Sequence, residues 1–477
     1  GDDRVNFNFD LDSGIDGVVT VDLGAGNDRI DVSNTLGDGS YDGNGLYLTE
    51  FKAEQDHFDG GDGVDEITVL SGGVMVREEY DRLNLDIVNF EELRIMTEND
   101  DNEVDASRLT DFNKITFDGA WNQNSVYVTG VQADQTIRAV NFDDDLSVEA
   151  DGYVAGDRMG GDLHVVIGES NQALDYSIAE SLYLYGDDVT VDFVGATADD
   201  DLAFQAAASY IYGDVTNLTL NFVNDGLYSV ANDDTEDQYA SIYAGSDDDE
   251  MANLESVTLT GEGMQSAEVY NYQGSVLTTV DATAYALEAV MDGDTQYNLT
   301  DSYQDDYYGD ADDYYSSFYY EDYNGAVATT VKLNINQEQI SNDYLYFGDD
   351  SAVAGSNLDN TDVITGFDIT NDFIDYNEEG FVFAGVTGGL GEDAVVNESL
   401  SLRANLETMA SVDVDVDIDF GLVFEYKGST YLYFDNAFDN GSGTEYNTVT
   451  DNDFLVKLTG VTGADGDSTF FFNYDLS

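Results

Sequence analysis

The chain has 477 residues, of which 100 are Asp or Glu and 14 are Lys or Arg, so its formal net charge is −86. A chain this acidic cannot present the cationic face that a phosphate backbone requires, which excludes nucleic acid as a partner. The chain contains no Cys, which excludes disulfides and thiolate metal sites, and its sequence has no apolar run long enough to insert into a membrane as a helix.

Hydrophobic residues make up 42% of the chain, so we expect it to bury a core despite its charge. So many carboxylates on one compact body must be offset by bound cations or by salt. We expect Ca²⁺, a hard ion that takes oxygen ligands from carboxylates and backbone carbonyls. The alternative is adaptation to salt, in which the carboxylates are simply solvated.

The first region, residues 1 to 80, contains Gly/Asp repeats next to short predicted strands such as 5–9. Gly60-Gly61-Asp62-Gly63-Val64-Asp65-Glu66-Ile67-Thr68 fits the nonapeptide G-G-x-G-x-D-x-U-x, in which U is a large aliphatic residue, at every position. Residues 23–31 fit with the first Gly replaced, and residues 1–6 fit the last six positions. Glycines permit a tight turn that directs carbonyl oxygens inward, and Asp adds a charged ligand. Because the chain opens inside a repeat, we expect further chain before residue 1.

These repeats resemble those of the RTX (repeats-in-toxin) proteins, in which stacked turns bind Ca²⁺ in a parallel β-roll. The resemblance implies ligand carboxylates at Asp3, Asp28 and Asp65, and Asp62 is a further candidate ligand in the last of these turns. It also implies turn-shaping glycines and inward-pointing aliphatic residues, namely Gly26, Gly60, Gly61 and Gly63, and Val5, Ile30 and Ile67. The three repeated aspartates lie 25 and 37 residues apart (28 minus 3, 65 minus 28) instead of nine. We therefore expect intervening residues such as 34–58 to loop out or to add coils.

The second region, residues 81 to 345, has predicted strands such as 125–129 and 216–222. A strand-like phrase recurs at 90–95, 179–184 and 254–259, and two copies are followed by Val-Asp-Ala-Ser or Val-Asp-Ala-Thr. Ordered repeats of this kind are typical of a parallel β-solenoid, in which each coil buries the apolar face of its neighbour. Chance recurrence of common strand sequences is the alternative. A segment dense in Tyr and Asp, 301–325, is either a linker or a contact surface.

Weaker Gly/Asp turns occur outside the first region. In each of them a carboxylate and backbone carbonyls could surround one ion, although a plain solvated turn is the alternative. The candidate ligands in these turns are Asp188, Asp247, Asp249 and Asp350.

The third region, residues 346 to 477, is predicted to be β-rich, with one helix at 398–410 whose apolar residues fall on one face. Residues 362–368 and 371–376 resemble the start of the terminal domain of type I-secreted RTX proteins, and residues 431–435 and 453–461 resemble its last strands. The resemblance implies an uncleaved C-terminal export signal. Residues 412–420 alternate Asp with Val or Ile, which predicts a strand with one carboxylate face, suited to cations or to solvent.

Catalytic motifs are missing from the sequence. The two histidines, His57 and His164, form no H-E-x-x-H zinc motif, and no G-x-S-x-G, phosphate-binding or dinucleotide-binding motif occurs. We therefore predict that the chain is not an enzyme. A polysaccharide-acting β-helix enzyme is the least favoured alternative.

These patterns together predict an all-β protein made of parallel β-roll and β-solenoid segments with a β-rich C-terminal domain. The resemblance is strongest to S-layer proteins of Gram-negative bacteria. It implies a secreted structural protein at the bacterial cell surface that binds several Ca²⁺ ions and assembles with itself into a lattice or fibre. Cell-surface polysaccharide is a further candidate partner. The alternative is a segment of a large RTX adhesin that binds glycan or a host surface.

Overall fold

The chain folds into two compact units, Gly1–Gln238 and Tyr239–Ser477. The computed structural model describes residues 1–6, 20–32, 57–71, 74–97, 102–119, 125–140, 143–154, 160–169, 177–194, 206–223, 239–245, 251–263, 266–287, 291–292, 295–296, 318–334, 343–348, 355–368, 372–376, 396–410, 421–434, 449–450 and 453–461. No helix within these ranges is long and apolar enough to cross a membrane.

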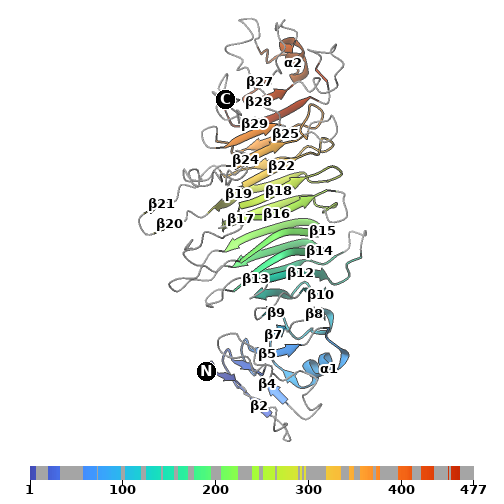
Figure 1. The fold of residues 1–477 in the computed structure, drawn as a ribbon, viewed down its shortest axis with the longest axis vertical. Helices are drawn as coiled ribbons and strands as arrows, with labels where there is room; N and C mark the ends of the chain where they lie inside the picture. Colours follow the sequence, from blue (N-terminus) through green and yellow to red (C-terminus); the bar gives the residue numbers. More distant parts are fainter. Residues whose placement is uncertain are drawn as a thin grey trace, which may run out of the picture. The chain divides into compact units, whose positions relative to one another are not determined.

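A long ladder of parallel strands runs through the first unit and can be followed in Figure 1. Its strands are β1 (Arg4–Asn6), β3 (Arg29–Asp31), β5 (Glu66–Ser71), β7 (Glu92–Thr97), β9 (Lys114–Gly119), β11 (Thr136–Val140), β13 (Leu163–Gly168) and the C-terminal halves of β14 (Ser177–Val194) and β15 (Ala206–Val223). The register stacks one apolar residue of each strand on that of the next, and all but the first are fully buried: Val5, Ile30, Ile67, Leu93, Ile115, Ile137, Val165, Val191 and Leu220. Each coil thus covers the apolar face of its neighbour, as in a β-solenoid.

A second parallel ladder of the first unit contains β8 (Asn102–Asp105), β10 (Val126–Val131), β12 (Asp143–Ala150) and the N-terminal halves of β14 and β15. The two long strands therefore supply one strand to each ladder. Three short strands, β2 (Thr20–Asp22), β4 (His57–Asp59) and β6 (Ile87–Val88), form a separate parallel sheet. Helix α1 (Arg77–Leu85) follows β5, and the short 3-10 helix η3 (Ala106–Arg108) follows β8.

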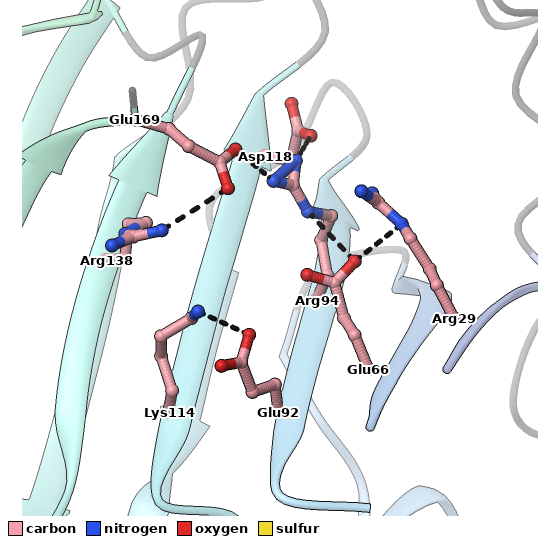
Figure 2. Close-up of polar contacts among 8 residues, drawn as sticks. All are labelled: Arg29, Glu66, Glu92, Arg94, Lys114, Asp118, Arg138 and Glu169. Carbon is pink, nitrogen blue, oxygen red and sulfur yellow. Dashed lines mark hydrogen bonds and ion pairs between the residues drawn. The ribbon is translucent and has the colours of Figure 1, made fainter. Parts of the chain in front are cut away.

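Ion pairs connect strands of the first ladder with one another and with Glu169, which directly follows β13 (Figure 2). They are Arg29–Glu66 (2.7 Å), Arg94–Glu66 (3.7 Å), Arg94–Asp118 (2.6 Å), Arg138–Glu169 (3.3 Å), Arg94–Glu169 and Lys114–Glu92. Arg94 is buried, and burial alone would lower its pKa, but the three surrounding carboxylates outweigh burial and raise the pKa. The guanidinium therefore stays charged and links coils through paired buried charges.

The second unit has two parallel ladders as well. One contains β17 (Ser256–Gly263), β19 (Thr279–Leu287), β23 (Thr330–Lys332), β25 (Asp362–Thr365) and β29 (Phe454–Thr459). The other contains β16 (Tyr239–Ala244), β18 (Ser266–Asn271), β22 (Phe318–Asp322), β24 (Asp343–Phe347) and β26 (Phe373–Tyr376). A short hairpin, β20 (Met291–Asp292) with β21 (Thr295–Gln296), lies between β19 and β22 in the sequence.

Half-buried tyrosines stack along one face of the ladder that begins with β16. The Tyr243 and Tyr270 rings are 4.8 Å apart and nearly parallel, and the Tyr319 and Tyr344 rings are 5.4 Å apart. Each pair joins strands of consecutive coils, because its members are register partners. Stacked aromatic pairs stabilise a fold by about 0.5–1.5 kcal/mol beyond their buried area.

The last part of the second unit changes from parallel to antiparallel pairing. Strand β28 (Ser429–Phe434) pairs antiparallel with β29 and with β27 (Gly421–Tyr426). Helix α2 (Leu402–Ala410) packs Leu406 and Met409 against a hydrophobic cluster that includes Leu422, Phe424 and Leu455. This cluster gives the end of the second unit a local core of its own.

The predicted all-β fold is confirmed, with mostly parallel ladders of solenoid or roll type and a strand-rich C-terminal part. A helix is also confirmed in the predicted range 398–410, but α2 begins at Leu402. The ladders continue across both predicted region boundaries, since β5 pairs with β7 on either side of residue 80, and β24 spans residue 345 and pairs with β26.

Other predictions need correction. The predicted Gly/Asp turn at Asp188, residues 186–188, is part of strand β14 and pairs with β15, at the point where β14 passes from the second ladder to the first. Two copies of the recurring phrase form strands in different ladders, 93–95 in the first and 182–184 in the second, so their recurrence does not mark equivalent positions. Helix α1 was not predicted, because it is largely charged and buries only a few side chains such as Tyr80 and Leu83. The predicted strand at 412–420 lies outside the described residues.

Candidate metal site

The glycine turns of the first unit stack directly on one another. Residues Ala25 and Asp62 form a parallel bridge, Gly26 N donates to Asp62 O at 3.0 Å, and Asp62 N donates to Gly24 O at 2.8 Å. A Cβ atom added to Gly61, where φ is +97°, would lie 1.8 Å from the Gly24 carbonyl oxygen. The two turns can approach this closely only because glycine occupies these positions.

The motif aspartates form a ladder across successive coils. Asp28 Oδ1 accepts a hydrogen bond from Asp3 N at 2.6 Å, and Asp65 Oδ1 accepts one from Asp28 N at 2.7 Å. Glu91 Oε2 continues the series by accepting from Asp65 N at 2.9 Å. We call Asp3, Asp28, Asp65 and Glu91 the carboxylate ladder. Its members are separated by 25, 37 and 26 residues, so coils of unequal length bring them into register.

Two carboxylates of this ladder are buried. Asp65 is 0% exposed and Asp28 is 2% exposed, and the Oδ2 atom of each has no hydrogen-bond partner. Burial raises the pKa of Asp65, and the negative charges of Asp28, Glu91 and Asp59 raise it further, against the hydrogen bond from Asp28 N. A buried carboxylate among other carboxylates must be neutralised by a proton or by a cation.

The residues fit an oxygen-coordinated cation such as Ca²⁺. The unpartnered Oδ2 atoms of Asp28 and Asp65 belong to consecutive coils. A backbone oxygen lies near one of them, because a Cβ atom added to Gly60 would be 2.9 Å from Asp65 Oδ2 and 2.2 Å from the Asn89 carbonyl oxygen. No group of three or more His, Asp or Glu side chains in the described part of the chain could hold a metal alone. Asp28 and Asp65 would therefore hold an ion together with backbone oxygens, which is a ligand mixture that Ca²⁺ accepts. The ion would supply charge neutralisation between coils.

No family model matches this chain, and no curated protein matches it. The assignment of Ca²⁺ to the turns therefore depends on the residues themselves.

The other predicted ligands are placed differently. Asp3 is exposed and enters the ladder through its backbone N–H, and Asp62 is exposed while its backbone joins the stacked turns. Gly63 packs on Gly26, since an added Cβ would lie 1.6 Å from the Gly26 carbonyl oxygen. Asp188 is remote from the ladder, where its Oδ1 accepts from Asn217 Nδ2 at 2.7 Å. Asp247, Asp249 and Asp350 lie outside the described residues.

Sequence reasoning missed Glu91. This residue belongs to the phrase 90–95, which the pattern indicates as a strand, and no Gly-Gly turn precedes it. Its longer side chain nevertheless accepts the hydrogen bond from Asp65 N, in the same way as Asp65 accepts the one from Asp28 N. A search for any acidic residue immediately before a buried strand, without the glycines, would have included it.

Proposed function

We propose that the chain is a secreted, calcium-dependent structural protein that assembles with copies of itself into an S-layer or similar lattice on a bacterial surface. The observation that supports this best is the carboxylate ladder, in which Asp28 and Asp65 are buried in consecutive coils with an unpartnered oxygen each. In a chain of net charge −86, such a ladder makes the stacking of coils depend on a counterion.

Calcium binding would make folding depend on whether the chain is inside or outside the cell. At low Ca²⁺ inside a cell, repulsion between carboxylates opposes stacking of the coils, and this keeps the chain compatible with export. Extracellular calcium modules bind with dissociation constants of about 10⁻⁴ to 10⁻³ M, so the chain would fold once outside.

Self-assembly is supported by the surface of the second unit. Tyr243, Tyr270 and Tyr344 are only partly buried and stack with aromatic residues of the neighbouring strand. Aromatic side chains are the preferred anchors of protein interfaces. A row of them repeated from coil to coil offers a contact surface suited to another copy of the chain.

The variant Asp65→Asn tests the calcium site. Asn keeps an oxygen that can accept from Asp28 N, but it removes the charge that would bind the ion. We expect Ca²⁺ to bind the full chain about tenfold more weakly or worse at this site, because ligand charge sets affinity in such sites. Isothermal titration and circular dichroism during Ca²⁺ titration would measure this, with the exposed Asp134→Asn as the matched control. Unchanged affinity in D65N would overturn the proposed site.

Electron microscopy with and without Ca²⁺ tests the assembly. We expect a two-dimensional lattice with Ca²⁺ and its loss after chelation. A monomer that binds glycans on an array would favour the adhesin alternative, and product release from acidic polysaccharides would favour an enzyme.

A further inference from the structure

A second group of buried polar residues lies in the second unit. Asn271 ends β18, Asp322 ends β22 and Asp362 begins β25, and all three are 0% exposed. Tyr320 and Thr329 border them, since Asn271 Nδ2 lies 3.3 Å from both hydroxyl oxygens. We call these five residues the Asp322 cluster.

Hydrogen bonds fix one oxygen of each carboxylate. Asp322 Oδ1 accepts from Asn324 N at 2.7 Å and from Asn271 Nδ2 at 3.0 Å. Asp362 Oδ1 accepts from Thr329 N at 2.7 Å. The two carboxyl groups also lie within hydrogen-bonding reach of each other. The Oδ2 atoms of Asp322 and Asp362 and the Oδ1 atom of Asn271 have no donor, so three buried oxygens of one cluster are unpartnered.

The cluster contains two acids and no base. Neither Asp322 nor Asp362 forms an ion pair with a basic residue in the described part of the chain. A proton shared between the two Oδ2 atoms would satisfy both of them, but it would leave a charge of −1 and an unpartnered Asn271 Oδ1. Buried oxygens without a donor are rare in folded proteins, and a cation bound between the two carboxyl groups would neutralise both of them and replace the missing partner of each Oδ2.

We propose that the Asp322 cluster binds one divalent cation of the Ca²⁺ type. Two carboxylates balance its charge, and the amide and hydroxyl oxygens are neutral ligands of the kind that Ca²⁺ accepts. Mg²⁺ fits less well, because it usually retains several waters, whereas these side chains are fully buried. The site lies in the second unit and shares no residue with the carboxylate ladder, so it does not depend on the function proposed above.

The ion would act where residues that are far apart in the sequence meet in adjacent strands. Asn271 and Asp322 are register partners although they are 51 residues apart, and Thr329 and Asp362 are 33 residues apart. Bringing together the ends of a longer loop costs more conformational entropy. A cation shared by residues from β18, β22 and β25 would cross-link these three strands. Gly355 leaves room for this arrangement, because a Cβ there would lie 2.1 Å from the Asp322 carbonyl oxygen.

Counting retained ions tests the proposal. The full chain is loaded with Ca²⁺, passed into calcium-free buffer with a short chelator chase, and analysed by elemental mass spectrometry. We expect Asp362→Asn and Asp322→Asn each to lose one Ca²⁺ per chain relative to the wild type, because an ion held by buried residues should exchange slowly. The exposed neighbour Asp359→Asn should lose none.

The control with D65N separates this proposal from the proposed function. Loss of an ion in D362N but not in D65N supports the Asp322 cluster and not the carboxylate ladder. Loss of an ion in D65N but not in D362N overturns the proposal for the Asp322 cluster. An unchanged ion count in a folded D362N chain, with increased stability, would identify a shared proton instead. If these variants do not fold, an anomalous difference map of the Ca²⁺-loaded wild type decides, because the proposal requires a peak between Asp322 and Asp362.

Discussion

Asp372 shows how burial acts on a single acid in this chain. Its Oδ2 accepts from Asp368 N at 2.7 Å and its Oδ1 accepts from Asp343 N at 3.2 Å, and it is 5% exposed. Burial raises the pKa of Asp372 to about 8, and the charges of Asp343 and Asp368 add to the rise, while the two hydrogen bonds oppose it. The folded chain therefore holds a proton at neutral pH that an unfolded Asp, with a pKa of about 3.9, has released.

The pH dependence of stability follows from this difference. Because the folded pKa is the higher one, the stabilising contribution of protonated Asp372 is complete below about pH 4 and is lost as pH rises toward about 8. In the neutral variant Asp372→Asn, the free energy of unfolding should fall less steeply from pH 4 to pH 8 than it does in the wild type. Urea unfolding at a constant Ca²⁺ concentration and constant salt would measure the two slopes. Equal slopes would show that Asp372 does not titrate in this range.

At the scale of the strand and turn, the apolar column and the glycine turns form a repeating unit. Ile30 and Ile67 follow their motif aspartates by two residues and are buried one above the other. The nonapeptide therefore predicts its own local structure, including which side chains enter the core. The same pattern predicts the stacking of Gly24 and Gly61, because both turns carry the same signal.

Partners in neighbouring coils were harder to predict. Asp65 bonds Asp28 and Glu91, which are 37 and 26 residues away, and Asp322 meets Asp362 across a similar separation. The number of residues between register partners varies along the chain, so sequence spacing does not reveal register. The Asp322 cluster has no motif at all, since its acids become a group only when three strands align. Register is decided by which apolar residues stack, and many Val, Ile and Leu residues could do so.

Replacing Gly61 by Ala tests the stacked turns. Gly61 and Gly152 both have positive φ, at +97° and +77°, so Ala is strained at either position by about 1–2 kcal/mol. Only at Gly61 does the new Cβ collide with backbone, 1.8 Å from Gly24 O, whereas nothing lies within 4 Å of it at Gly152. We expect Gly61→Ala to lower the unfolding free energy by clearly more than Gly152→Ala and to weaken Ca²⁺ binding. Equal losses in chemical denaturation would mean that the turns do not stack.

For the molecule as a whole, charge is the dominant constraint. With 100 acidic and 14 basic residues, few carboxylates can form ion pairs, and three of the bases, Arg29, Arg94 and Arg138, are already paired with Glu66 and Glu169. Repulsion among the remaining acids opposes any compact state, and it is reduced either by general screening or by ions bound at defined places. Screening acts on all exposed charges alike, whereas bound ions act on buried oxygens such as those of Asp65 and Asp362.

Matched salts separate these two effects. If screening dominates, NaCl at the ionic strength of a millimolar CaCl₂ solution should fold the chelated chain as well as CaCl₂ does. We expect it not to, because monovalent ions at that strength leave the buried carboxylates of Asp28 and Asp65 unneutralised. Far-UV circular dichroism and small-angle scattering should show an expanded chain in NaCl and a compact, β-rich chain in CaCl₂. The variant D65N should need more CaCl₂ than D134N to reach the same compaction. Identical titrations in the two salts would show that the acidity is an adaptation to salt and that the carboxylate ladder binds no ion.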